Sequence, residues 1–195
     1  MAAPPWAAPV SVPARRKVMV VADPCRESVG ALQWALTHAV LEHDEVVLLH
    51  VEPPTPRRGP LAVLLRRAAP HSVAGAAATA ASSAEDSPEF LDGMRAKCKQ
   101  TQPSVAVNVE RVEMEDNGKA TTILSQTRTL GVDLLVVGQP RRSWLGGGSN
   151  YSKSMDTAEY LIENSKCLCV GVQKKGQKAG YVLNTKTHKN FWLLA

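Results

Sequence analysis

No hydrophobic run in this sequence reaches the roughly 18 residues that a membrane-spanning helix needs, so a membrane-spanning protein is excluded. Aromatic residues make up only 5% of the chain, and they do not alternate with basic ones. Because single-stranded nucleic acid is bound by stacking its bases on exposed aromatic rings, nucleic acid is not an expected partner. The chain also lacks a Walker-type loop, a nucleophile elbow and a metal-binding cluster of side chains. These absences predict a protein that is not an enzyme.

Charge and cysteine content are typical of an ordinary intracellular domain. The net charge is +5, but the basic residues lie in short scattered groups, as on a solvated surface. The four cysteines include no CxxC pair. Cys167 and Cys169 lie two apart, which in a strand places both on one face, and we expect buried small side chains there rather than metal ligands. Without a visible secretory signal, the cytoplasm is the expected compartment, with the nucleus also open.

Two segments have the composition of disordered chain. Residues 1–16 are rich in alanine and proline and contain no acidic residue, which is typical of a disordered leader and also of a weak organelle transit signal. Residues 53–87 contain several prolines and an Ala/Ser/Gly-rich stretch. A loop of this length is rare inside a compact domain, so we expect a mobile insertion. One domain is therefore predicted over residues 17–175, followed by a basic C-terminal tail over residues 176–195.

Outside these segments, strand-like and helix-like patterns alternate along the chain. Runs rich in valine and leucine predict strands, and apolar residues at helical spacing predict helices. The predicted strands cover residues 17–22, 45–51, 105–112, 133–137 and 167–172, and the predicted helices cover residues 28–43, 88–99, 119–130 and 157–164. This alternation predicts an α/β, Rossmann-like fold: a five-stranded parallel sheet with helices on both faces. Ligands of such sheets bind beyond the carboxyl ends of the strands, where the strand order reverses.

Four segments carry a family resemblance. They comprise a strand with its helix, two further strands, and a helix with the last strand, at residues 17–36, 47–51, 132–138 and 158–172. Together they resemble the universal stress protein family, within the adenine nucleotide alpha hydrolase-like superfamily. The closing residues 190–195 resemble the tails of plant-type, single-domain members. The resemblance implies a strand order of 3-2-1-4-5, a role in stress response, and a homodimer formed through the last strand.

The resemblance also implies an adenine nucleotide as ligand, either ATP or AMP, with Mg²⁺ if ATP binds. Family members place an Asp after the first strand near the adenosine, the backbone after the second strand near the base, and a glycine loop around the phosphates. The corresponding residues here are Val21, Ala22, Asp23, Val51, Val137, Gly138, Arg141, Gly148, Ser149 and Ser152. Asp23 has a structural alternative, because with Pro24 it can form an Asx-turn that starts the first helix. His50 is expected to be a packed histidine rather than a base.

The phosphate loop departs from the family pattern Gly-x2-Gly-x9-Gly-Ser/Thr. Gly138 takes the first position, but Arg141 stands at the second. Strict counting puts the last two positions on residues 151–152, whereas counting back from the predicted last helix puts them on residues 155–156. In the second case Asp156 would oppose phosphate at the helix N-terminus. Two features can compensate, a Gly-Gly-Gly-Ser nest at residues 146–149 and an ion pair of the arginines with phosphate.

Three functions remain open at this point. The first is a nucleotide-responsive binding or signalling domain. The second is a dimeric interaction module whose phosphate loop has degenerated and which acts through its tail and its insertion. The third is weak hydrolysis of ATP or a related transfer reaction, although no catalytic base or metal site can be assembled from the sequence.

Overall fold

The protein is built from strands and helices that alternate along the chain. A computed structural model describes residues 15–54, 82–140, 152–176, 179–189 and 191–193. In chain order its elements are β1 (Lys17–Val21), α1 (Arg26–Trp34), the π-helical turn η1 (Ala35–Ala39), β2 (Glu45–Glu52), α3 (Ser82–Thr101), β3 (Ala106–Glu113), α4 (Lys119–Thr129), β4 (Leu134–Gly138), α5 (Ser152–Asn164), β5 (Leu168–Lys175), β6 (Ala179–Asn184) and β7 (Phe191–Leu193). The predicted leader and most of the predicted insertion lie outside the described residues.

Strands β1 to β5 form a parallel sheet whose centre is buried on both faces. In β1 the four residues from Val18 to Val21 are at most 1% exposed to solvent, as expected for a strand covered from two sides. β1 pairs in parallel with β2 and β4, β2 with β3, and β4 with β5. The observed order β3-β2-β1-β4-β5 confirms the predicted strand order 3-2-1-4-5, which reverses between β1 and β4.

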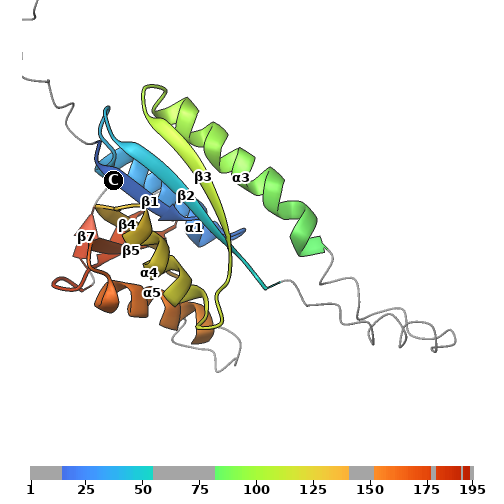
Figure 1. Cartoon of the computed structure of the whole chain (residues 1–195). Coiled ribbons are helices and arrows are strands. Elements are labelled where there is room, and N and C mark those ends of the chain that lie inside the picture. Colours follow the sequence, from blue (N-terminus) through green and yellow to red (C-terminus); the bar gives the residue numbers. More distant parts are fainter. Residues whose placement is uncertain (1–14, 55–81, 141–151, 177–178, 190, 194–195) are drawn as a thin grey trace, which may run out of the picture.

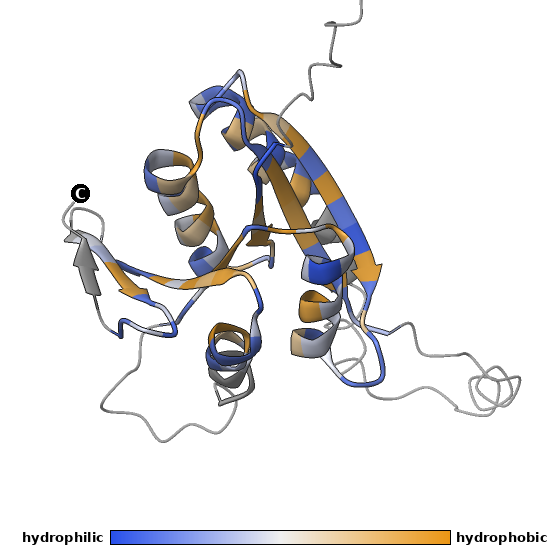
Figure 2. Ribbon diagram, turned by 60° about the vertical axis from the view of Figure 1, so that its left-hand side comes forward, coloured by the Kyte–Doolittle hydropathy of each residue, from blue (hydrophilic) through white to orange (hydrophobic). Residues whose placement is uncertain are grey.

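The two faces of the sheet carry separate hydrophobic cores. Val18 and Val20 of β1 pack with side chains of α1 and α3 on one face, and Met19 and Val21 pack with side chains of α4 and α5 on the other. Figure 1 shows these two helical layers on either side of the strands. Figure 2 shows hydrophobic residues concentrated along the strands, between the helices. The predicted α/β class with helices on both faces is confirmed.

Within the described residues the sheet has seven strands rather than the predicted five. After β5 the chain turns back and adds β6 antiparallel to β5, and then β7 antiparallel to β6. Tyr181 and Val182 of β6 are only 5% and 3% exposed, so this part of the predicted tail belongs to the core. The basic composition of residues 176–195 made the segment resemble a solvated tail, although β5 would otherwise carry an unpaired edge. The β5 edge expected to form a homodimer is thus already paired within the chain.

Helix boundaries also differ from the predicted ones. The first helix was predicted over residues 28–43, but its helical turns end with η1. A closed turn follows, because the Leu41 N–H donates to the Asp44 carboxylate and the Asp44 N–H donates to the Leu41 carbonyl, both at 3.0 Å. Helices α3 and α5 both begin before their predicted starts at residues 88 and 157.

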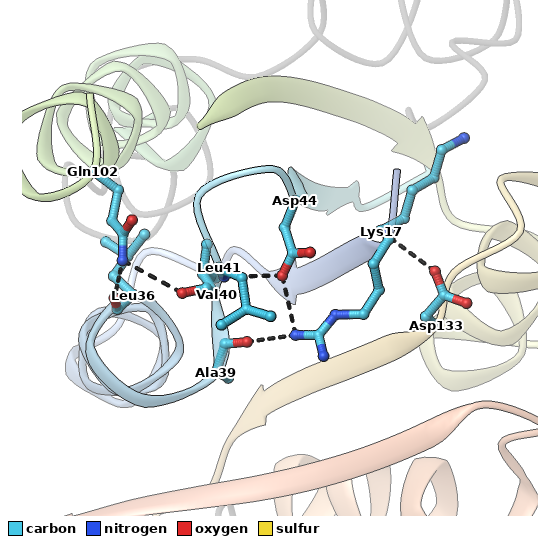
Figure 3. Close-up of polar contacts among 9 residues, drawn as sticks. Lys17, Leu36, Ala39, Val40, Leu41, Asp44, Gln102 and Asp133 are labelled. Carbon is cyan, nitrogen blue, oxygen red and sulfur yellow. Dashed lines mark hydrogen bonds and ion pairs between the residues drawn. The ribbon is translucent and has the colours of Figure 1, made fainter. Parts of the chain in front are cut away.

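Polar side chains close the amino-terminal edge of the sheet (Figure 3). Arg16 pairs with the buried Asp44 at 3.0 Å and also donates to the carbonyl of Ala39. Asp133, just before β4, accepts the backbone N–H of Lys17 at 2.8 Å. These contacts fix the starts of β1, β2 and β4 relative to one another. The carboxyl-terminal edge, at the other end of the same strands, is the edge at which ligands of such sheets bind.

Candidate functional site

The carboxyl ends of β1 and β4 meet where the strand order reverses. Val20 of β1 pairs with Val136 of β4, so the residues that follow them lie at the same edge of the sheet. Asp23 comes two residues after the end of β1, and Gly138 is the last residue of β4. The structure therefore brings together the two residues that the sequence placed on either side of this switch point.

A buried serine holds the turn that carries Asp23. Ser28 is 3% exposed; its hydroxyl donates to the carbonyl of Val21 at 3.0 Å and accepts the N–H of Asp23 at 3.0 Å. Helix α1 has Cys25 at its N-cap position, without a side-chain capping bond. The Asp23 carboxylate instead accepts a hydrogen bond from the Lys119 ammonium. It is thus turned toward another element, and the Asx-turn alternative is not observed.

Lys119 is a site residue that the sequence analysis missed. Its Nζ lies 2.6 Å from Oδ1 of Asp23, and the two side chains are 32% and 28% exposed. Lys119 is the first residue of α4 and follows Gly118, whose φ of 91° suits glycine at the helix entry. Residues that open a helix after a parallel strand lie at the carboxyl edge of the sheet. Lys119 could have been added to the candidate residues by this rule. Its ion pair with Asp23 could not have been predicted in the same way.

Gly138 is required for the packing of α1 on β4. A β-carbon at this position would lie 2.5 Å from the backbone carbonyl carbon of Glu27 and 2.9 Å from the backbone nitrogen of Ser28. The first turn of α1 therefore rests directly on the end of β4. The next residue, Gln139, donates its N–H to the carbonyl of Val172 at 2.8 Å, and its side-chain oxygen accepts a bond from Asn184 at 2.5 Å. Both contacts fix the path of the chain as it leaves Gly138.

Four of the remaining candidate residues are buried and contribute to the core or to the hydrogen bonds between strands. Val21, Val51 and Val137 point their side chains into the core beneath α4 and α5, so only their backbone could contact a ligand. Ala22 is fully buried, its N–H donates to the carbonyl of Leu49 at 2.7 Å, and its carbonyl accepts a bond from a histidine.

That histidine is His50, which is 5% exposed. Its Nδ1 lies 2.7 Å from the Ala22 carbonyl oxygen. Because a carbonyl can only accept a hydrogen bond, Nδ1 carries the proton. The prediction of a packed histidine is confirmed, and the bond ties β2 to the turn after β1.

The phosphate side of the site lies largely outside the described residues. Arg141, Gly148 and Ser149 belong to the undescribed stretch between β4 and α5. Ser152 opens α5, and the first turn of this helix contains no acidic residue. Because the helix starts here and not at residue 157, residue 156 lies in its second turn and not at its start.

The fold is a doubly wound α/β domain whose strand order reverses between β1 and β4. The model of the universal stress protein family matches residues 14–172, and the chain belongs to this family. Among curated protein sequences no significant match is found.

Solved structures with the same fold have low sequence identity to this chain. A universal stress protein family member from Burkholderia pseudomallei is 21% identical, covers 80% of this chain and 93% of its own, and has a TM-score of 0.52. A family member from Arabidopsis thaliana with AMP bound is 16% identical, with coverages of 84% and 95% and a TM-score of 0.51. A universal stress protein in complex with cAMP is 14% identical, with coverages of 82% and 98% and a TM-score of 0.56. At these identities the likeness shows the fold.

Proposed function

We propose that this chain binds an adenine nucleotide at the carboxyl edge between β1 and β4, and that it acts as a nucleotide-responsive module in a stress response or in signalling. The observation that carries the proposal is the meeting of Asp23 and Gly138 at the reversal of strand order. Solved structures of the same fold include one with AMP bound and one in complex with cAMP, which supports this ligand class.

Each side of the site has a distinct proposed role. The Asp23 carboxylate accepts hydrogen bonds from hydroxyl groups of the ligand, because a carboxylate can only accept. The backbone near Val51 lies beside the base. The phosphates lie toward the start of α5 at Ser152, because the free N–H groups of a first helical turn favour an anion. Residues 146–149 and Arg141 supply further phosphate contacts.

ATP would bring Mg²⁺ with it. This ion keeps several of its waters and is usually held by substrate phosphates together with one or two carboxylates. Asp23 pairs with Lys119 and is assigned to hydroxyl groups of the ligand, so such an ion would be held by the phosphates and by water. We propose binding without a catalytic step of the protein's own, and release of inorganic phosphate from ATP above the rate of a protein-free control would contradict that part of the proposal.

Calorimetric titration of ATP and AMP tests the proposal directly. We expect saturable binding to the wild-type chain and loss of most of it in Asp23→Ala. Asp133→Ala is the matched control, because it removes the same side chain from the opposite edge of the sheet, where the Asp133 carboxylate accepts the N–H of Lys17 at the start of β1 (Figure 3). If neither nucleotide gives heat at millimolar concentration, or if the two variants bind alike, the proposed site is wrong.

Self-association is a second proposal, and the sheet order supports one place for it. Among the described strands, β5 is paired on both sides, whereas β3 and β7 are paired on one side only. Unpaired strand edges are the usual sites of strand addition. We propose that the homodimer implied by the family resemblance forms through β7, the last described strand, because β5 is already paired within the chain.

A further inference from the structure

The ion pair between Asp23 and Lys119 joins two distant parts of the chain at the proposed nucleotide site. Asp23 lies in the turn after β1, whereas Lys119 opens α4, 96 residues later. Among the described residues, Asp23 is the only carboxylate that pairs with Lys119. The first turn of α4 contains no acidic residue. In the free protein the ammonium therefore neutralises the charge of the Asp23 carboxylate at this edge.

The two partners differ in how freely they can move. The backbone of Asp23 is held by the buried Ser28, which bonds to both ends of its turn. Lys119 carries its charge at the end of a flexible four-carbon stem, and a lysine ammonium is a common partner of phosphate oxygens. Because both side chains are about a third exposed, the pair is weak and a ligand can open it. The lysine is the partner that moves when that happens.

Charge determines which ligands gain from this arrangement. An isolated Asp23 carboxylate would repel a phosphate group that approaches the same edge, and it has no proton to donate to one. Lys119 cancels this charge and offers donors to an anion. A neutral nucleoside needs neither, because its hydroxyl groups can bond to Asp23 alone. Within this ion pair, Asp23 is thus suited to bind hydroxyl groups and Lys119 is suited to bind an anion.

From these contacts we infer that Lys119 is a specificity-determining residue, which makes the site prefer phosphorylated adenine nucleotides over neutral adenosine. On binding, the ammonium transfers from Asp23 to a phosphate oxygen, and Asp23 bonds to a hydroxyl of the ligand. This inference rests on the proposed function, since it assigns a preference within the same site. Its measure is the ratio of the dissociation constants for adenosine and AMP.

The test is calorimetric titration of ATP, AMP and adenosine into wild type and Lys119→Met, which keeps the apolar stem and removes the charge. Hydrogen bonds to charged groups contribute enough that we expect AMP and ATP to bind about tenfold more weakly to the variant. Adenosine should bind unchanged. Raising the salt concentration should weaken AMP binding to wild type more than to the variant, because ions screen exposed charges.

Two further variants keep the result interpretable. Lys99→Met removes an exposed lysine from the last turn of α3, so it makes the same change in net charge away from the site and should leave all three affinities unchanged. Lys119→Gln retains hydrogen-bonding groups without the charge and should behave like Lys119→Met if the charge is decisive. Circular dichroism of both site variants checks that they are folded.

The possible outcomes separate this inference from the proposed function. Unchanged AMP affinity in both site variants overturns the inference while the proposed function stands. Equal weakening of AMP and adenosine also overturns it, because Lys119 would then only position Asp23. If the wild-type chain binds none of the three ligands, the proposed function fails and the inference fails with it.

Discussion

Replacing Gly138 by alanine should destabilise the fold and displace the candidate site at the same time. A β-carbon there would lie 2.5 Å and 2.6 Å from the carbonyl carbon and oxygen of Glu27, and 2.9 Å from the nitrogen of Ser28. Contacts this short are essentially not found at real β-carbons. All three atoms are backbone in the first turn of α1, so no side chain can rotate away. Helix α1 must therefore move off β4, taking Ser28 and the Asp23 turn with it.

The expected magnitude follows from the kind of contact. Overpacking a closely packed interior usually costs about 1–3 kcal/mol, and clashes with backbone atoms favour the upper part of that range, about 2–3 kcal/mol. In a domain of this size each kcal/mol lowers Tm by about 2–4 °C, so Gly138→Ala should unfold about 4–12 °C below wild type. Urea unfolding followed by circular dichroism measures the same loss, as a lower midpoint at an unchanged m-value.

Gly93→Ala is the matched control for this substitution. Gly93 lies exposed within α3, and a β-carbon there would meet no atom within 4 Å. Because alanine favours a helix over glycine by about 0.8–1.0 kcal/mol, this variant should be more stable than wild type. Opposite shifts in the two variants would show that space at Gly138, and not the loss of glycine as such, is decisive. A Gly138→Ala midpoint equal to that of wild type would refute the packing argument.

Three further predictions concern a turn, buried thiols and the sheet edge. Ser28→Ala leaves the buried Val21 carbonyl and the half-buried Asp23 N–H without the hydroxyl that bonds to both. We expect a loss of about 1–3 kcal/mol in urea unfolding. A smaller loss would show that other contacts hold the Asp23 turn. Burial raises the pKa of Cys98 to about 11 and of Cys169 to about 12 from 9.0. Since the unfolded chain then loses thiol protons that the native chain keeps, stability should fall between pH 9 and 11, by up to about 1.4 kcal/mol per pH unit for each thiol. In a variant with alanine at both positions, the free energy of unfolding should fall less steeply over this pH range. Equal slopes in wild type and variant would show that the two thiols do not cause the fall. Deletion of residues 176–195 opens the β5 edge, so light scattering should show self-association of the truncated chain, whereas a monomeric mass would show that the free edge does not pair.

The fold could be predicted largely because its central strands are uninterrupted apolar runs. Residues such as Val18 to Val21 predict a strand buried on both faces, and nothing but a parallel α/β sheet accommodates several of these in alternation with helices. Strand order required the family resemblance, because local pattern does not determine which strands are neighbours. The tail was misread for a related reason. Its pairing with β5 depends on the edge that β5 leaves open, which is a property of the assembled sheet.

The site could be predicted only where it follows from strand ends. Asp23 and Gly138 each come directly after a predicted strand, so the order of the strands in the sheet is enough to bring them together. The roles of their neighbours could not be read in the same way. Gly138 resembles a phosphate-binding glycine in the sequence, yet the backbone of Glu27 already occupies the space a side chain would need. Lys119 was missed because its partner lies 96 residues away.

The two features that sequence did not reveal hold opposite sides of the site. On one side, Lys119 pairs with Asp23. On the other, Asn184 of β6 bonds to the side chain of Gln139, which lies so close over Gly171 that a β-carbon there would be 2.6 Å from it. The added strands therefore brace the chain where it leaves Gly138 toward the proposed phosphate loop, in addition to closing the sheet. If the chain binds a nucleotide there as proposed, loss of this brace in Asn184→Ala should weaken binding in calorimetric titration, although no residue of β6 need touch the ligand.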